Sequence, residues 1–173
     1  IVDIFKISSG DNNFYELIKY CASFKKPMII STGMTNIDEI RKILRMLKKI
    51  NFPNKKLALL HCISDYPVND SEANLLSIKY LKDKLPVTIG YSDHVIGSES
   101  CLVAASFGAK IIEKHFTLDN YFSNFRDHLI SLNPKDMRHM ILSIRRVENM
   151  IGRYNKQISK SEKKNISSTR RSI

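Results

Sequence analysis

Polar side chains that could do chemistry recur where short apolar runs of this chain end. VTIGYSDHVIGS runs into Ser92 and His94, and KIIEKHFTLD runs into Glu113 and His115. Each histidine has an acid close by in the sequence, Asp93 in the first case and Glu113 in the second. If the two runs are neighbouring strands, the imidazoles lie about 5 Å apart, where they can share one divalent metal ion. Two ordinary loop histidines remain an equal alternative.

Hydroxyl groups, a lysine and glycines follow the first two apolar runs. FKISSGD carries Lys6 and Ser9, and MIISTGM carries Ser31 and Gly33. Hydroxyls, an ammonium group and free backbone N–H groups suit a cluster of anionic oxygens, so phosphate is the expected guest. Ordinary turn and capping chemistry also explains the serines. Lys6 is the stronger indicator, because a lysine at the end of a buried strand needs an anionic partner.

Five apolar runs would supply the strands that position these groups. They lack polar alternation, which is typical of parallel strands covered on both faces. Helical spacing of apolar residues lies between them, and strand starts recur about every 23 to 30 residues, the length of one βα unit. We expect strands over 2–7, 27–32, 57–62, 87–92 and 110–116. We expect helices over 13–24, 36–50, 72–84 and 98–109, and a last helix capped by Asn133 and closed by Gly152.

Repeated βα units fit either an open doubly wound sheet or a (β/α)₈ barrel. The barrel is favoured because every predicted strand ends in polar residues, and a barrel brings all its strand ends to one site. No GxGxxG follows the first strand, and no P-loop occurs. Five units cannot close an eight-stranded barrel. We therefore expect a partial α/β barrel over 1–152 and a basic linker over 153–173.

The composition argues against several other classes of protein. No apolar run approaches the roughly 20 residues of a membrane span, and nothing at the start resembles a signal peptide. The net charge is +11, but 153–173 alone hold seven basic residues and one acid, so we expect a solvated tail. We expect no nucleic-acid or membrane partner. Cys21, Cys62 and Cys101 lie in apolar segments and are expected as buried thiols, which predicts a reducing, cytoplasmic location.

The strand ends, taken in order, resemble the sialic acid synthase family over essentially the whole chain. The motifs that carry the resemblance are FKISSGD, PMIISTGM, LLHCISDYP, IGYSDH, IEKHFTLD, RDHLISLNP and SIRRVENMIG. The resemblance implies units four to eight of a (β/α)₈ barrel, without the first three units and without the family's C-terminal antifreeze-like domain. It implies condensation of phosphoenolpyruvate with an N-acetylated hexosamine such as N-acetylmannosamine, with release of phosphate. It also implies a divalent metal, Mn²⁺ or Mg²⁺, and a homodimer of the full-length protein.

The resemblance assigns roles to individual residues. The phosphoenolpyruvate-binding positions are Lys6, Ser9, Ser31 and Ser92. The metal ligands are His94 and His115, and the positions that contact the sugar are Ser64, Tyr66 and Asp127. The catalytic groups are Lys6, Glu113 and Asp127.

Three departures from the family pattern point to a modified sugar, such as a legionaminate or pseudaminate precursor. Asp11 replaces a frequent glutamate, Ser64 replaces the asparagine of the N-acetylmannosamine branch, and NFRDH replaces GPDH, which adds Arg126. With barrel units missing, we expect no activity from the chain alone.

Three alternatives stay open. One is another phosphate-binding barrel, an aldolase that uses Lys6 as a Schiff base. The second is a basic binding module that depends on 153–173, and the third is an inactive remnant. Among the other histidines, His61 is expected in the core, and His128 lies in a loop where it could contact substrate.

Overall fold

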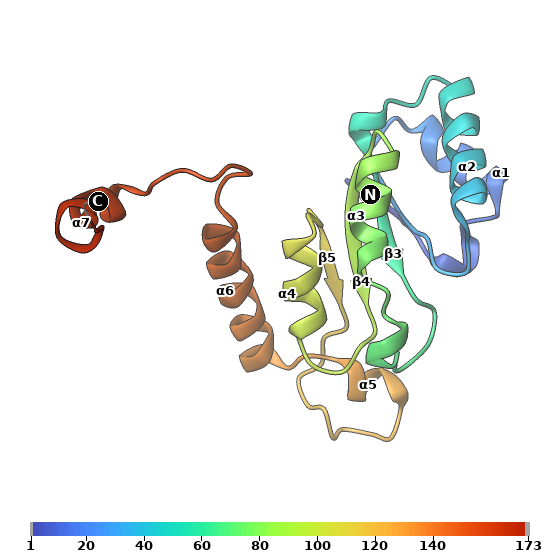
Figure 1. Cartoon of the computed structure of the whole chain (residues 1–173). Coiled ribbons are helices and arrows are strands. Elements are labelled where there is room, and N and C mark those ends of the chain that lie inside the picture. The colour runs from blue at the N-terminus through green and yellow to red at the C-terminus, as the bar shows by residue number, and fades with distance from the viewer. Residues whose placement is uncertain (1, 172–173) are drawn as a thin grey trace.

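A computed structural model describes residues 2–171 and contains one sheet of five parallel strands (Figure 1). The strands lie side by side in sequence order, and all four neighbouring pairs are parallel. An open doubly wound sheet reverses its strand order at a switch point, whereas a (β/α)₈ barrel keeps its parallel strands in sequence order, as here. The structure thus confirms the predicted α/β half-barrel. The strands are β1 (Phe5–Ile7), β2 (Met28–Ser31), β3 (Leu57–Cys62), β4 (Thr88–Asp93) and β5 (Ile112–Lys114).

Seven α-helices accompany the sheet in the described part of the chain. Five were expected, although α3 begins later than predicted because Asp70–Glu72 form a separate 3₁₀ turn. The short helix α5 and the helix α7 were not expected. The helices are α1 (Tyr15–Ser23), α2 (Ile37–Lys49), α3 (Leu76–Lys84), α4 (Glu99–Ser106), α5 (Arg126–Ile130), α6 (Pro134–Ile151) and α7 (Lys160–Thr169).

Local sequence signals explain where two long helices begin. At α2, the Asn36 side chain accepts from the backbone N–H of Glu39, whose own side chain accepts from the N–H of Asn36, which is a capping box. At α6, the Asn133 side chain accepts from the N–H of Asp136, and Pro134 occupies the first helical turn. The predicted cap of the last helix is confirmed.

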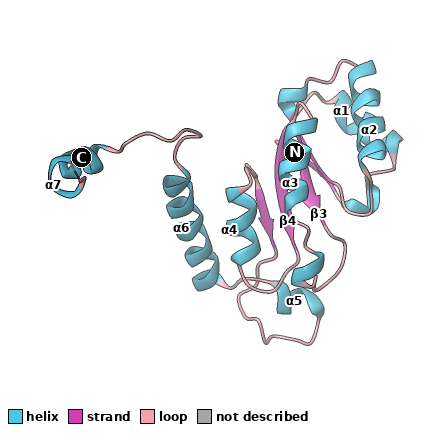
Figure 2. Cartoon of the chain, viewed as in Figure 1, coloured by secondary structure: helices cyan, strands magenta, loops and turns pink. Residues whose placement is uncertain are grey.

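Helices α1 to α4 cover one face of the sheet and build the core there (Figure 2). Ile30 and Leu59 on the strands and Ile18 and Ile78 on the helices have no exposed surface. Because side chains alternate along a strand, the residues between these apolar ones point to the opposite face. That face is the inner face of the half-barrel and carries the polar groups described below.

The C-terminal part of the chain departs from the sheet. Helix α6 packs against α4 through Cys101, Met140 and Ile144, whereas α7 lies apart from the sheet and all its residues are exposed (Figure 1). The expected linker region therefore contains a helix. Cys21, Cys62 and Cys101 are buried free thiols, as predicted. No helix within residues 2–171 is both long and apolar enough to cross a membrane.

Candidate active site

Four of the predicted phosphate-site and catalytic residues meet at the carboxyl ends of four strands. Ser92 and Glu113 are register partners on β4 and β5, and Ser92 Oγ donates to Glu113 Oε1 at 2.8 Å. Lys6 Nζ from β1 lies 3.3 Å from the same carboxylate oxygen and donates to Ser31 Oγ at 3.0 Å. We call Lys6, Ser31, Ser92 and Glu113 the strand-end cluster. Its contact between β1 and β5 requires a strongly curved sheet, since these are the two edge strands.

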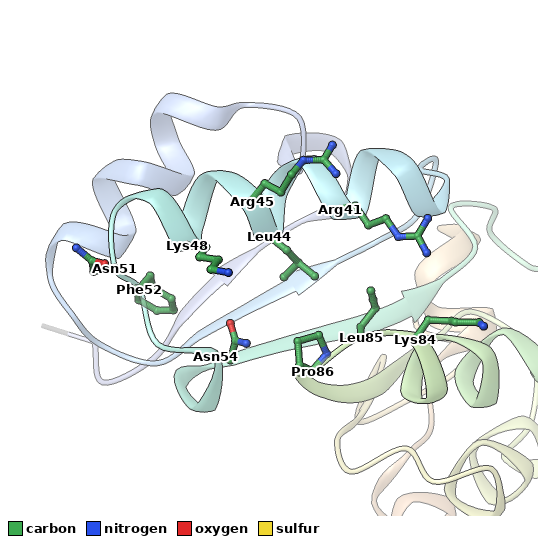
Figure 3. A pocket seen from close by; sticks show the side chains of 10 residues that line it. All are labelled: Arg41, Leu44, Arg45, Lys48, Asn51, Phe52, Asn54, Lys84, Leu85 and Pro86. Atoms are coloured by element: carbon green, nitrogen blue, oxygen red, sulfur yellow. The ribbon is translucent and has the colours of Figure 1, made fainter.

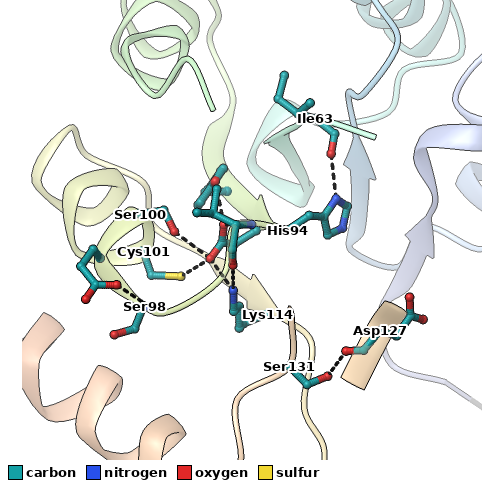
Figure 4. A network of polar contacts seen from close by, with 12 residues as sticks. Ile63, His94, Ser98, Ser100, Cys101, Lys114, Asp127 and Ser131 are labelled. Carbon is teal, nitrogen blue, oxygen red and sulfur yellow. Dashed lines mark hydrogen bonds and ion pairs between the residues drawn. The ribbon is translucent and has the colours of Figure 1, made fainter. Parts of the chain in front are cut away.

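The two predicted metal-ligand histidines lie next to each other. The ring centroids of His94 and His115 are 5.3 Å apart, and the Tyr66 ring packs 4.0 Å from that of His94. His94 Nδ1 lies 2.7 Å from the carbonyl oxygen of Ile63 (Figure 4), which fixes the ring and leaves Nε2 available. On the other side, Asp127 Oδ2 is 3.9 Å from His115 Nδ1. The expected juxtaposition of the imidazoles is therefore present.

Burial lowers the pKa of His94, a tendency that its hydrogen bond to the Ile63 carbonyl opposes and the neighbouring His115 reinforces. A neutral imidazole is the form that binds a metal ion. Within residues 2–171, however, no set of three or more histidine, cysteine or acidic side chains is arranged to hold a metal. The pair thus offers two protein ligands and leaves the other positions to water or substrate.

Ser9 and Ser64 lie together beside Gly33. The backbone N–H of Gly33 donates to Ser9 Oγ at 3.1 Å, and a Cβ at Gly33 would lie 2.3 Å from Ser64 Oγ. A side chain here would have to push both serine hydroxyls aside. Ser64 Oγ is buried and has no hydrogen-bond partner among the described residues. An unpaired buried hydroxyl costs about 1–3 kcal/mol, a cost that a ligand oxygen would offset. Ser64 thus lies beside Ser9, one of the predicted phosphoenolpyruvate positions.

Tyr66 forms part of the rim of the site. The Arg126 guanidinium lies 4.7 Å over the Tyr66 ring and 3.8 Å from Asp127, so α5 brings a positive charge over the aromatic ring that packs against His94. Burial raises the pKa of the Tyr66 phenol, which keeps it a hydrogen-bond donor near neutral pH.

One residue near the histidines was missed by the sequence analysis. Cys62 Sγ lies 4.0 Å from His94 Nδ1, and burial raises the pKa of its thiol. Its position at the end of β3, in register with Ser92, was the available signal.

Three other polar residues serve the framework. Asp93, although next to His94 in sequence, points to the helix-covered face, where it pairs with Lys114 at 2.9 Å. The acid beside His94 is therefore not part of the histidine pair. His61 is in the core as expected, stacked 5.8 Å from Tyr91. His128 lies on α5, and its Nδ1 is 2.9 Å from Thr117 Oγ1, a contact that ties α5 to the start of the loop before it.

A hollow lined by none of these groups lies between α2 and α3 near the start of β4 (Figure 3). Its volume is about 600 Å³, and it has a basic rim and an apolar floor. No carboxylate, imidazole, thiol or hydroxyl lines it, so it offers no acid–base or nucleophilic chemistry. The lining residues are Arg41, Leu44, Arg45, Lys48, Asn51, Phe52, Asn54, Lys84, Leu85 and Pro86.

The buried Asp93 predicts a loss of stability in acid. Burial alone would raise its pKa, but the charge and hydrogen bond of Lys114 outweigh this, so the folded pKa lies below the ordinary value. A depressed folded pKa contributes stability that is complete above the unfolded pKa of about 4 and is lost as the pH falls towards the folded pKa. We expect the melting temperature to fall steeply below about pH 4, and to fall less in Asp93→Asn. Identical pH profiles measured by circular dichroism would contradict this assignment.

The fold and the strand ends define a partial (β/α)₈ barrel with a polar site at the carboxyl ends of its strands. A solved structure, the N-acetylneuraminic acid (sialic acid) synthetase of Leptospira borgpetersenii, superposes with a TM-score of 0.87 at 36% identity, covering 99% of this chain and 60% of that chain. A model of the NeuB family matches residues 1–156. The chain belongs to the NeuB family.

Curated relatives include two named synthases. The N,N'-diacetyllegionaminic acid synthase of Campylobacter jejuni is 41% identical over 170 residues, which are 98% of this chain and 51% of the relative. The N-acetylneuraminate-9-phosphate synthase of Mus musculus is 35% identical over 158 residues, 91% of this chain and 43% of the relative. This chain spans about half the length of the curated relatives that it matches.

Proposed function

We propose that this chain is the catalytic-site half of a nonulosonic acid synthase, which condenses phosphoenolpyruvate with an N-acetylated hexosamine and releases phosphate. One observation carries the proposal: the strand-end cluster lies directly beside the histidine pair. Ser92 on β4 and His94 just after it are two residues apart, as are Glu113 on β5 and His115 just after it. Two strand residues span about 7 Å, so one small substrate can reach both groups.

In this proposal the phosphate end of phosphoenolpyruvate lies on Lys6, Ser9, Ser31 and Ser92. The ammonium group and hydroxyls would hold the phosphoryl oxygens and stabilise charge as the C–O bond breaks. The unpaired Ser64 hydroxyl supports an anionic guest at this end. Its role in contacting the sugar is also proposed, since Ser64 lies beside Ser9 and two residues before Tyr66.

Glu113 is proposed as the group that handles a proton. It accepts from Ser92 and faces Lys6, so it is held in hydrogen-bonding range of whatever occupies the cluster. A carboxylate in that position can take the proton of a water molecule that adds to the cationic intermediate after carbon–carbon bond formation.

His94 and His115 are proposed to hold Mn²⁺ or Mg²⁺, and two imidazoles with open positions fit a site that must also admit a substrate oxygen. When bound, the ion supplies a Lewis acid that polarises the sugar aldehyde. Asp127 would orient His115 and bind a sugar hydroxyl, and Tyr66 would pack against the sugar. A homodimer of the full-length protein is part of the same proposal.

The sugar is proposed to carry two N-acetyl groups. Identity to the diacetyllegionaminic acid synthase exceeds identity to the N-acetylneuraminate-9-phosphate synthase, 41% against 35%. Ser64 is smaller than the asparagine of the N-acetylmannosamine branch, and Arg126 adds donors at the rim. Both features favour a bulkier, more polar substrate.

A chimera tests the function, because this chain corresponds to about half of the related enzymes. In the chimera, this chain replaces the matching half of the Campylobacter jejuni synthase. The chimera is then supplied with phosphoenolpyruvate, Mn²⁺ and either N-acetylmannosamine or a diacetamido hexose. We expect phosphate release, with the bridging oxygen of labelled phosphoenolpyruvate recovered in phosphate. Lys6→Ala should lower the rate of phosphate release about 10²–10³-fold, because an electrostatic contribution is lost, and Lys19→Ala on α1 should not.

The same chimera tests metal dependence and the aldolase alternative. His94→Ala/His115→Ala should remove the response to Mn²⁺, whereas His139→Ala on the exposed side of α6 should keep it. Borohydride with a keto acid should trap nothing, since the proposed reaction forms no imine. A folded chimera that releases no phosphate, or an imine trapped at Lys6, would refute the proposal. The chain alone is expected to be inactive, and its turnover above a Lys6→Ala control would overturn that expectation.

A further inference from the structure

A buried ion pair lies directly behind the candidate site, on the helix-covered face of the sheet (Figure 4). The side chains of Asp93 and Lys114 are 0% and 1% exposed, and Lys114 Nζ lies 2.9 Å from Asp93 Oδ2. The carboxylate accepts from four further donors, two on β4 or in the loop after it and two on α4. They are Tyr91 Oη at 2.8 Å, the Val95 N–H at 3.0 Å, Ser100 Oγ at 2.8 Å and Cys101 Sγ at 3.2 Å.

The pair alternates with the residues of the site. Asp93 lies between Ser92 and His94, and Lys114 lies between Glu113 and His115. Asp93 and Lys114 are also register partners of β4 and β5. Since neighbouring side chains on a strand point to opposite faces, fixing this pair fixes the residues on both sides of it.

Lys114 reaches beyond the strand. Its ammonium group also donates to the carbonyl oxygen of Val95, the residue that follows His94. The Lys114 side chain is therefore hydrogen-bonded both to Asp93, which precedes His94, and to Val95, which follows it. Burial alone does not call for such a pair, since most of the core on this face is built from apolar side chains.

We propose that the Asp93–Lys114 pair is a positioning device that sets the separation of His94 from His115 and of Ser92 from Glu113. Buried ion pairs add little net stability compared with apolar residues, and their best-attested role is to fix one register. The pair touches no substrate position. Its importance for catalysis rests on the proposed function, whereas its effect on the histidine geometry does not.

The test uses a double variant that keeps the fold. Asp93→Asn retains an acceptor for Tyr91 and Val95, both of which bind Oδ1, and Lys114→Met fills the same space without a charge. Each single variant leaves one buried polar group without its charged partner, so its melting temperature is expected to be lower. The double variant should recover a melting temperature near that of the unaltered chain.

Histidine geometry is then measured by nuclear Overhauser effects between the ring protons of His94 and His115 in the purified chain. The unaltered chain should show cross-peaks, because the rings are 5.3 Å apart between centroids. The double variant should lose them or weaken them severalfold while its methyl and amide spectrum stays folded. The matched control is Lys79→Met/Asp83→Asn, an exposed ion pair of the same 2.9 Å length on α3, which should leave the cross-peaks unchanged.

The outcomes separate this inference from the proposed function. Cross-peaks that persist at full intensity in a folded double variant overturn the positioning role, whatever the enzyme does. Their loss supports it, even if the chimera proves inactive. In an active chimera the same double variant should lower kcat by about 100-fold, the cost of a misplacement of roughly 1 Å, with a smaller change in KM.

Discussion

Lys6→Met should weaken the binding of phosphoenolpyruvate to the purified chain by roughly 10- to 150-fold, the equivalent of about 1.5–3 kcal/mol for a hydrogen bond to a charged group. Lys6 is the only cation of the strand-end cluster. Its ammonium group already holds the Ser31 hydroxyl and the Glu113 carboxylate, so it is in place before a ligand arrives. Methionine keeps the length of the side chain and removes the charge.

Glu113→Gln should act in the opposite direction on the same binding constant. A second anion beside the Glu113 carboxylate is repelled, and glutamine removes that repulsion while it can still accept from Ser92. The gain should be modest, a few-fold, because both side chains of the Lys6–Glu113 pair are more than a third exposed and water screens their charges. Turnover in the chimera should nevertheless fall, since the proposed proton acceptor is lost.

Calorimetric titration with phosphoenolpyruvate at constant pH measures both effects. Lys19→Met provides the matched control, because Lys19 forms an exposed 2.8 Å ion pair with Glu16 on α1, outside the cluster. Equal affinities for the unaltered chain and Lys6→Met would show that the anion binds elsewhere, for example in the basic hollow between α2 and α3. Tighter binding together with faster turnover in Glu113→Gln would contradict its role as a base.

Gly90→Ala should destabilise the fold more than other single methyl additions in the chain. A Cβ at this central position of β4 would lie 2.5 Å from Leu60 Cδ2 and 2.6 Å from the carbonyl oxygen of Ile111. Leu60 has no exposed surface into which to move, and the Ile111 carbonyl accepts the backbone N–H of Tyr91. The backbone itself must therefore shift, and β4 must separate from β5.

Overpacking of this kind costs about 1–3 kcal/mol, and contact with backbone places Gly90→Ala at the upper end. For a chain of this size, that corresponds to a melting temperature lower by about 6–12 °C. Gly10→Ala is the control, because its new Cβ would meet nothing closer than Ser8 Oγ at 3.7 Å. Equal thermal stability of the two variants would contradict the packing described for the inner face.

The strands could be predicted from sequence because each lies in a short, mainly apolar run that lacks polar alternation. The contacts across the sheet could not. The strand predicted over 87–92 was expected to end at Ser92. The sequence therefore did not define to which face of the sheet the Asp93 side chain points. The structure continues β4 through Asp93, and this one extra residue places its carboxylate on the helix side. Alternation then separates Asp93 from His94, although they are neighbours in sequence.

Two helices escaped prediction for different reasons. Helix α5 has only five residues, too few for a helical period to show. Helix α7 has no buried residue and hence no apolar stripe, although Ser159 and Glu162 form a capping box that the sequence does contain. The closeness of Ser64 to Gly33 depends on packing between loops after β2 and β3, which no local pattern reports.

The contact of Lys6 with Glu113 joins the two ends of the sheet, which gives it a consequence for the order of events during folding. Residues so distant in the chain meet only after the intervening strands have assembled, because closing so long a loop has an entropic cost that earlier contacts must first offset. The strand-end cluster is therefore among the last features to form and the first to be lost on partial unfolding. An anion that binds there stabilises every strand between the two residues at once. Hydrogen exchange in β2 and β3, which lie between them, should slow when the site is filled.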